Sequence, residues 1–399
     1  MTIAAYAPTL RNTHWGVVSV VVGSGIVTAI QVGKAAIATP LLQTDLGLDL
    51  AAAGWLTGIF AVLGLVGGIP AGTLVTRAGD RRTLVLGLGS IALGTIIGAT
   101  APGYTVLLAS RVLEGFGFLL VTVAGPAILN RMVGDGQRDI AFALWSCFMP
   151  AGLALAMLAG PLFSDWRALW WSNAVLAAAA ILAGLTVIPA VQARTSVSWR
   201  STISDAVHVL ASKGPVLLAA CFAFYSLMFF ALFSFLPVLL MEQMEIAHGT
   251  AGLLSALASG ANIIGNLGAG YLLARGANRC SLLIGAYLIM GLGGIGIFLE
   301  VLGATPTFLL CILFSAVGGL IPATLISSAP LLARSAALAP VIIGLVMQGS
   351  NLGQVIGPIA VGGAIETYGW TAAAGIVLIA ALMAAMAALA ISFEDGRTR

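Results

Sequence analysis

Lys34 is the only charged residue in a long stretch of sequence between His14 and Asp45, in a chain in which 8% of the residues are charged. At membrane depth a lone ammonium costs on the order of 2.5–3.5 kcal/mol. One explanation is a polar cavity that receives a negatively charged solute. The other is that the lysine stem snorkels to the nearer surface or that the ammonium has a structural partner.

Arg111 and Glu114 form a second group of charges inside an apolar stretch. They are three residues apart, which places them on one helical face and within reach of each other. Paired in this way they neutralise each other, and Lys34 is then expected to be the one uncompensated charge. A buried carboxylate beside an arginine can titrate, so Glu114 and Arg111 are candidate coupling residues for protons. The alternative is that Glu114 is only the structural partner of Arg111.

Polar side chains recur at helical spacing in three apolar stretches. Ser24, Thr28, Gln31 and Lys34 are spaced 4, 3 and 3, and the other two sets are Ser255, Ser259, Asn262 and Asn266, and Gln348, Asn351 and Gln354. Such stripes are costly against lipid and should face the interior, where they either line a cavity or hydrogen-bond between helices. A stretch of rings at 222–233 is either packing or a cavity wall, and its Tyr225 hydroxyl needs a partner. The predicted substrate-binding residues are Lys34, Gln31, Thr28, Tyr225, Asn262, Asn266, Gln348 and Asn351.

The composition predicts an all-α integral membrane protein. Hydrophobic residues make up 60% of the chain, and apolar stretches of about 20 residues recur from end to end, each long enough to cross a ~30 Å hydrocarbon core as a helix. The first stretch has no A-x-A-like cleavage site behind it and is expected to be a retained helix. The predicted spans are 15–40, 53–76, 83–101, 104–130, 140–163, 169–190, 215–240, 249–274, 281–302, 305–333, 341–364 and 370–392.

The charges predict the orientation of these spans. With the N-terminus in the cytoplasm, only Lys34, Arg111 and Arg167 of the 17 Lys and Arg fall in helices or outer loops, and the outer loops carry mainly acids. This is the positive-inside pattern. It predicts an even number of spans, both termini in the cytoplasm and a place in the inner (plasma) membrane.

Two halves are expected on either side of a polar segment. The proposed division is an N-terminal six-helix bundle at 1–191, a cytoplasmic linker at 192–214 and a C-terminal six-helix bundle at 215–399. The segment 71–81 is similar to 269–279, at an offset of 198, and Gly-Pro at 160–161 matches Gly-Pro at 357–358, at an offset of 197. Similar offsets at two places indicate duplication of a six-helix unit, a pattern typical of transporters.

Several of these segments resemble the major facilitator superfamily. The segment 72–82 is similar to the family's G-x-x-x-D-R-x-G-R-R loop, although Thr76 stands where the family has Asp and Asp80 interrupts the pattern. Arg111 to Gly117 is similar to the fourth-helix R-x-x-x-G-x-G segment, Gly152 to Pro161 to the fifth helix, and Asp165 to Asn173 to the opening of the sixth. Within the family the chain most resembles the bacterial branch that includes cyanate and nitroimidazole transporters.

The resemblance implies twelve transmembrane helices in two pseudo-symmetric bundles that rock around a central site, and a monomer. It also implies a conformational latch where cytoplasmic helix ends meet, with anionic-lipid anchoring as the alternative role for these residues. The latch residues are Gly72, Arg77, Arg81, Arg82, Arg275 and Arg279.

The predicted function is secondary active transport of a small, anionic solute, with protons or the substrate gradient as the driving force. The alternative is a proton-coupled pump that exports drugs or other organic compounds. No enzyme is expected: the histidines and cysteines are scattered, and there is no G-x-x-x-x-G-K-[ST] sequence for ATP. We expect no cofactor, no metal and no nucleic-acid partner; the expected partners are a small-molecule substrate, protons and the lipid bilayer.

Overall fold

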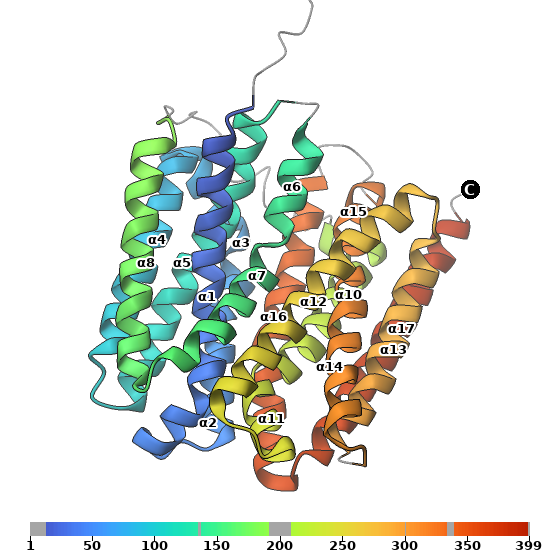
Figure 1. Ribbon diagram of the computed structural model, residues 1–399. Coiled ribbons are helices and arrows are strands. Elements are labelled where there is room, and N and C mark those ends of the chain that lie inside the picture. Colours follow the sequence, from blue (N-terminus) through green and yellow to red (C-terminus); the bar gives the residue numbers. More distant parts are fainter. Residues whose placement is uncertain (1–12, 135–136, 191–208, 300, 333–338, 398–399) are drawn as a thin grey trace, which may run out of the picture.

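The chain folds into helices that run the length of the molecule, as a computed structural model shows (Figure 1). The structure describes residues 13–134, 137–190, 209–299, 301–332 and 339–397, and this part of the chain contains no strand. The first half consists of α1 (Trp15–Leu46), α2 (Leu50–Gly58), η1 (Ile59–Ala61), α3 (Val62–Ala78), α4 (Asp80–Ala99), α5 (Tyr104–Met132), α6 (Arg138–Ser146), α7 (Phe148–Ala159), η3 (Gly160–Leu162) and α8 (Trp166–Val187). The second consists of α10 (Lys213–Phe233), α11 (Leu236–Met244), α12 (His248–Ala274), α13 (Arg279–Phe298), α14 (Ala304–Gly318), α15 (Leu320–Ser328), η4 (Ala329–Leu332), α16 (Ala339–Tyr368) and α17 (Thr371–Arg397).

Each of the twelve predicted spans corresponds to one helix or to consecutive helices with a break between them. By length and apolar composition, nine helices of the described residues are able to cross a membrane, or ten if the pair Ile140–Ser146 and Phe148–Leu162, bent by 41°, forms one span. The fold is the all-helical membrane architecture that the sequence predicts.

Turn and capping residues end the helices where the sequence changes. Gly47, in the left-handed conformation with φ 64°, ends α1, and the Asp49 carboxylate then accepts a hydrogen bond from the backbone N–H of Ala52 to begin α2. Asp165 caps α8 and Asn278 caps α13 in the same way. Side-chain caps of this kind satisfy N–H groups that a helix start leaves free.

Two sets of helices, α1–α8 and α10–α17, each pack mainly within themselves. The sets meet where α2 lies along α16 and where α7 lies along α12. The contacts are closest at the end of the molecule away from the start of α1 (Figure 1), where a Cβ on Gly54 would stand 2.3 Å from the carbonyl oxygen of Pro358. Most of the expected linker, 192–214, lies outside the described residues, so the domain boundaries stay a prediction.

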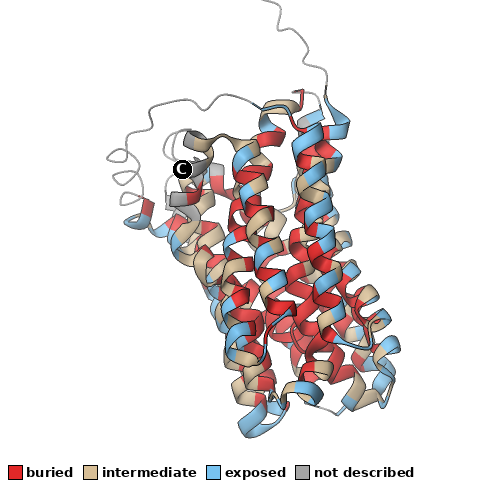
Figure 2. Ribbon diagram, turned by 90° about the vertical axis from the view of Figure 1, so that its left-hand side faces the viewer, coloured by how far each residue is buried: buried red, intermediate tan, exposed pale blue. Residues whose placement is uncertain are grey.

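The outer faces of the helices expose apolar side chains, as membrane helices must. Buried residues lie toward the interior of the bundle and exposed ones on the outward faces (Figure 2). Val175, Ile264 and Leu292 are each about two-thirds exposed or more, at 68%, 71% and 67%. A soluble protein rarely exposes so many large apolar residues together, and lipid accounts for this surface.

Candidate functional site

Lys34, Glu114 and Arg111 form a cluster of charges in the interior of the first half, where each is fully buried. Lys34 Nζ donates to Glu114 Oε1 at 2.8 Å, and the Arg111 guanidinium donates to the other carboxylate oxygen, Glu114 Oε2. The remaining two ammonium protons of Lys34 go to Gln31 Oε1 at 2.7 Å and to Thr95 Oγ1 at 3.2 Å. One carboxylate therefore holds two cations from different helices, α1 and α5.

Two residues that sequence reasoning missed complete this charge cluster. Thr95 of α4 lies 3.2 Å from Glu114 Oε1, and Asn173 of α8 accepts a hydrogen bond from Gln31 Nε2 at 3.2 Å. The Asn173 amide is itself held by donation to the Leu169 carbonyl at 2.8 Å. Because Asn173 and the Val27 carbonyl, at 3.0 Å, both accept from the Nε2 end of the Gln31 amide, the Oε1 end faces Lys34. Neither residue belongs to a polar stripe, so helical spacing carried no signal for them.

Arg111 is positioned by a break in the neighbouring span. Helix α2 ends at Gly58 and a 3-10 turn follows, so carbonyls in its last turn lack regular helical partners. Arg111 Nε donates to one of them, Leu56 O, at 3.1 Å. The guanidinium carbon lies 4.6 Å from the centre of the Phe60 ring, within the range of a cation–π contact. The second terminal nitrogen of Arg111 is buried without a hydrogen-bond partner.

The expectation that Lys34 is the one uncompensated charge is wrong. Lys34 shares Glu114 with Arg111, and its ammonium also lies 4.6 Å from the centre of the Trp170 ring. It does not snorkel, since its side chain has no exposed surface. Thr28, predicted beside it, is buried too, but its hydroxyl donates to the Ser24 carbonyl of its own helix.

In the second half, Tyr225, Asn262 and Asn266 come together as a buried polar group. Asn262 Nδ2 lies 3.2 Å from the Tyr225 hydroxyl and 3.0 Å from the Ser315 carbonyl, and Asn266 Nδ2 donates to Asn262 Oδ1 at 2.9 Å. The aromatic stripe is continuous beside it: Tyr225 and Phe229 are 5.8 Å apart between ring centres. These amides connect α10, α12 and α14, so they hold helices together as well as forming a polar surface.

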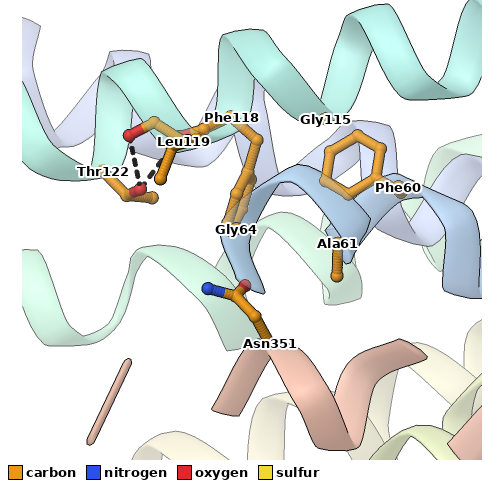
Figure 3. A pocket seen from close by; sticks show the side chains of 8 residues that line it. All are labelled: Phe60, Ala61, Gly64, Gly115, Phe118, Leu119, Thr122 and Asn351. Atoms are coloured by element: carbon orange, nitrogen blue, oxygen red, sulfur yellow. Dashed lines mark hydrogen bonds between the residues drawn. The ribbon is translucent and has the colours of Figure 1, made fainter. Parts of the chain in front are cut away.

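Asn351 of α16 lies between the two halves. Its side chain packs on Gly64 of α3, where an added Cβ would stand 2.4 Å from the amide. It lines a small cavity together with Phe60, Gly115 and Phe118 (Figure 3). Gln348, predicted on the same stripe, is half-buried like Asn351 but does not line this cavity. The structure therefore brings Asn351, but not Gln348, to a cavity between the halves.

The predicted latch residues have their described contacts within their own halves. Arg81 donates to the Leu185 carbonyl, and the Arg275 guanidinium carbon lies 4.3 Å from the centre of the Tyr271 ring. Arg82 is exposed and Arg279 is half-buried, while the surroundings of Gly72 and the side chain of Arg77 lie outside the described residues.

An ion pair in the same region was missed. Asp80, which appeared to interrupt the family pattern, accepts from Arg131 Nε at 2.7 Å and from its terminal nitrogen at 3.0 Å. This bidentate pair joins the start of α4 to the end of α5. The signal available in the sequence was an acid in the first turn of one helix and a base in the last turn of the next.

The family is shown by a model that covers most of the chain. The model described as the Major Facilitator Superfamily matches residues 21–346. The chain belongs to the major facilitator superfamily. Membership of this superfamily, together with the apolar helices described above, indicates a multi-pass membrane protein.

Relatives of this superfamily member include resistance and export proteins. The chain is 27% identical over 182 residues to the tetracenomycin C resistance and export protein of Streptomyces glaucescens, a match that spans 45% of the chain and 34% of that protein. It is 28% identical over 364 residues to the chloramphenicol resistance protein of Streptomyces lividans, spanning 87% of the chain and 89% of that protein. The first-listed relatives are matched over only 26–35% of their own length.

The fold of this superfamily member is also that of a solved structure. A bacterial homologue of the human lysosomal transporter Spinster, crystallised in an inward-facing and occupied conformation, superposes with a TM-score of 0.73 at 17% identity, covering 96% of this chain and 97% of that one. At this identity the likeness concerns the fold alone.

Proposed function

We propose that this chain exports small, uncharged organic compounds across the cytoplasmic membrane in exchange for protons, by alternating access of its two helical halves. The observation that carries the proposal is that all three ammonium protons of Lys34 are donated to protein acceptors. An anion would have to displace Glu114, Gln31 or Thr95 from the ammonium, while an uncharged solute leaves these contacts intact.

The surfaces between the halves suit such a solute. The cavity beside Asn351 is lined by aromatic and aliphatic side chains with few polar groups, the composition typical of sites for small organic molecules. The resistance and export functions in the names of the relatives support organic compounds as substrates. With the termini in the cytoplasm, as the charges predict, the close contacts around Gly54 lie on the outer side, which supports an inward-facing arrangement.

The charge cluster is the proposed proton site. It contains two cations and one carboxylate, so it carries one net positive charge when Lys34 is protonated and none when Lys34 is neutral. Arginine keeps its proton in proteins, whereas buried lysine gives its proton up readily. Proton exchange therefore takes place at the Lys34–Glu114 pair, while Arg111 keeps a fixed positive charge. The gain or loss of the proton changes how strongly α1 and α5 attract each other.

Transport into everted membrane vesicles tests this function, with chloramphenicol as the uncharged probe. We expect accumulation that requires an imposed pH gradient and stops when the gradient is dissipated. Lys34→Arg keeps the charge but cannot release a proton, so it should bind the probe and fail to accumulate it. Gradient-driven accumulation by Lys34→Arg at the wild-type rate would refute the role of Lys34.

A second candidate is the small-anion carrier. The net positive charge of the cluster and the unpartnered terminal nitrogen of Arg111 favour it. Thermal unfolding of purified protein separates the two, because a compound that binds only the folded state raises the melting temperature. Stabilisation by benzoate that is lost in Lys34→Gln supports the anion carrier. Stabilisation by chloramphenicol that survives in Lys34→Gln supports the exporter.

A further inference from the structure

The cavity between the halves shares a wall with the charge cluster, and that wall is the Phe60 side chain. Phe60 lines the cavity with Phe118, at 5.2 Å between ring centres and 67° between ring planes (Figure 3). The same ring also lies 4.6 Å from the guanidinium carbon of Arg111. A single buried side chain, 1% exposed, therefore contacts both the proposed solute site and the proposed proton site.

The cavity is too small, in this conformation, for a compound of antibiotic size. In this conformation it offers about 10 Å³ of space, whereas sites for such compounds measure about 300–1,000 Å³. Any occupant must therefore push side chains aside.

The backbone around Phe60 is tightly packed and leaves little room for a shift. A Cβ on Gly115 would stand 1.8 Å from the Phe60 carbonyl oxygen, so α5 already touches the 3-10 turn that carries Phe60. Side chains that line the cavity must move instead, and the largest of them, the rings of Phe60 and Phe118, can do so by changing their side-chain torsions without a shift of the backbone.

We propose that Phe60 transmits occupation of this cavity to the charge cluster, and so couples solute binding to proton release; this inference rests on the proposed function. The face of an aromatic ring is negative and stabilises a cation above it. When an occupant turns the ring away from Arg111, the positive field at Lys34 increases. The protonated ammonium becomes less favourable, and its proton passes to water.

Proton release on binding tests this coupling. Purified protein in weak buffer with a pH indicator is mixed with chloramphenicol, and protons released per bound probe are counted. We expect about one for the wild type. Phe60→Leu should bind the probe within a few-fold of wild-type affinity and release less than about a fifth as many protons, since leucine fills the space without a ring face. Phe60→Tyr, which keeps the ring, should release the wild-type number.

Phe118→Leu is the matched control, because Phe118 lines the same cavity while Arg111 lies over Phe60. It should weaken binding and leave the number of protons per bound probe unchanged. If Phe60→Leu does not fold, Phe60→Met takes its place, as an unbranched side chain that adapts to an irregular space. Normal release by the folded Phe60 variant overturns the inference alone. A wild-type protein that neither binds the probe nor releases protons overturns the proposed function and this inference together.

Discussion

Glu114 is the residue on which the charge cluster depends, because it is the carboxylate that both buried cations share. Removing one partner of a buried ion pair is expensive, whereas removing a surplus charge is not. Neutralising Glu114 is therefore predicted to cost much more stability than neutralising Lys34, although the two side chains are hydrogen-bonded to each other.

Glu114→Gln should lower the free energy of unfolding by about 3–5 kcal/mol, because it leaves Lys34 and Arg111 together without a counter-charge. Lys34→Met should stay within about 1 kcal/mol of the wild type, because it leaves one cation paired with one carboxylate. Thermal unfolding of both variants in detergent measures the difference. Equal losses in the two variants would contradict the assignment of a net positive charge to the cluster.

Asn173 acts through Gln31 on the same cluster. Asn173→Ala removes one of the two acceptors that orient the Gln31 amide, the other being the Val27 carbonyl at 3.0 Å, so Gln31 Oε1 is held less firmly toward Lys34. We expect a loss of about 1 kcal/mol in stability and a shift in the pH dependence of transport. Ser172→Ala is the control, because the neighbouring Ser172 hydroxyl donates to a carbonyl of its own helix. An unchanged pH profile in Asn173→Ala would leave Asn173 with a structural role only.

At the scale of the helices, the break between α2 and α3 explains how the charge cluster comes to lie beside the apolar cavity. The 3-10 turn Ile59–Ala61 frees the Leu56 carbonyl for Arg111 and brings the Phe60 backbone against Gly115. Only glycine fits there, because any side chain on α5 at that position would overlap the carbonyl of the turn.

Gly115→Ala is therefore predicted to lower the stability of the protein, whereas a glycine-to-alanine substitution at an open helix position is not. Overpacking at this contact should cost about 1–3 kcal/mol and displace Phe60 from Arg111. Gly89→Ala, in α4 with no atom within 4 Å of the added Cβ, should be neutral or slightly stabilising. Melting temperatures of the two variants compare the sites. A Gly115→Ala protein as stable as Gly89→Ala would mean that α5 does not approach the turn as closely as described.

At the scale of the whole molecule, the two halves are held together at the end away from the start of α1. Besides the packing of Gly54 on Pro358, the Glu366 carboxylate accepts from the Leu50 N–H at 3.2 Å. His248 Nε2 lies 2.8 Å from the Ile37 carbonyl, again between the halves. Alternating access requires these contacts to break and re-form.

Gly54→Val should shift the molecule toward the state in which this end is open. A loss of about 1.4 kcal/mol in the closed state changes the ratio of the two states tenfold. A single cysteine at Ala53, which is 2% exposed, reports the change in a background without other cysteines. Its reaction with a maleimide should be about tenfold faster in Gly54→Val. Gly89→Ala is the control, because an added Cβ there meets no neighbouring atom. Equal reaction rates in Gly54→Val and Gly89→Ala would count against this closed interface.

The sequence by itself determined the class of the protein and its helices. Hydropathy and helical spacing are local properties, and they predicted the membrane spans and the faces that carry Lys34, Asn262 and Asn351, while short motifs resembled those of the family. They also placed Arg111 beside Glu114, because three residues of helix bring two side chains together regardless of the rest of the chain.

Only the tertiary structure decided which charges share a partner. Lys34 and Glu114 are 80 residues apart, and Thr95 and Asn173 come from two further helices. Their meeting depends on which helix packs against which, and on the break in the second span that lets Arg111 and Phe60 approach. Spacing along one helix carries no information about the rotation and depth of its neighbours. The sequence therefore marked Lys34 as exceptional without showing that it shares the Glu114 carboxylate with Arg111.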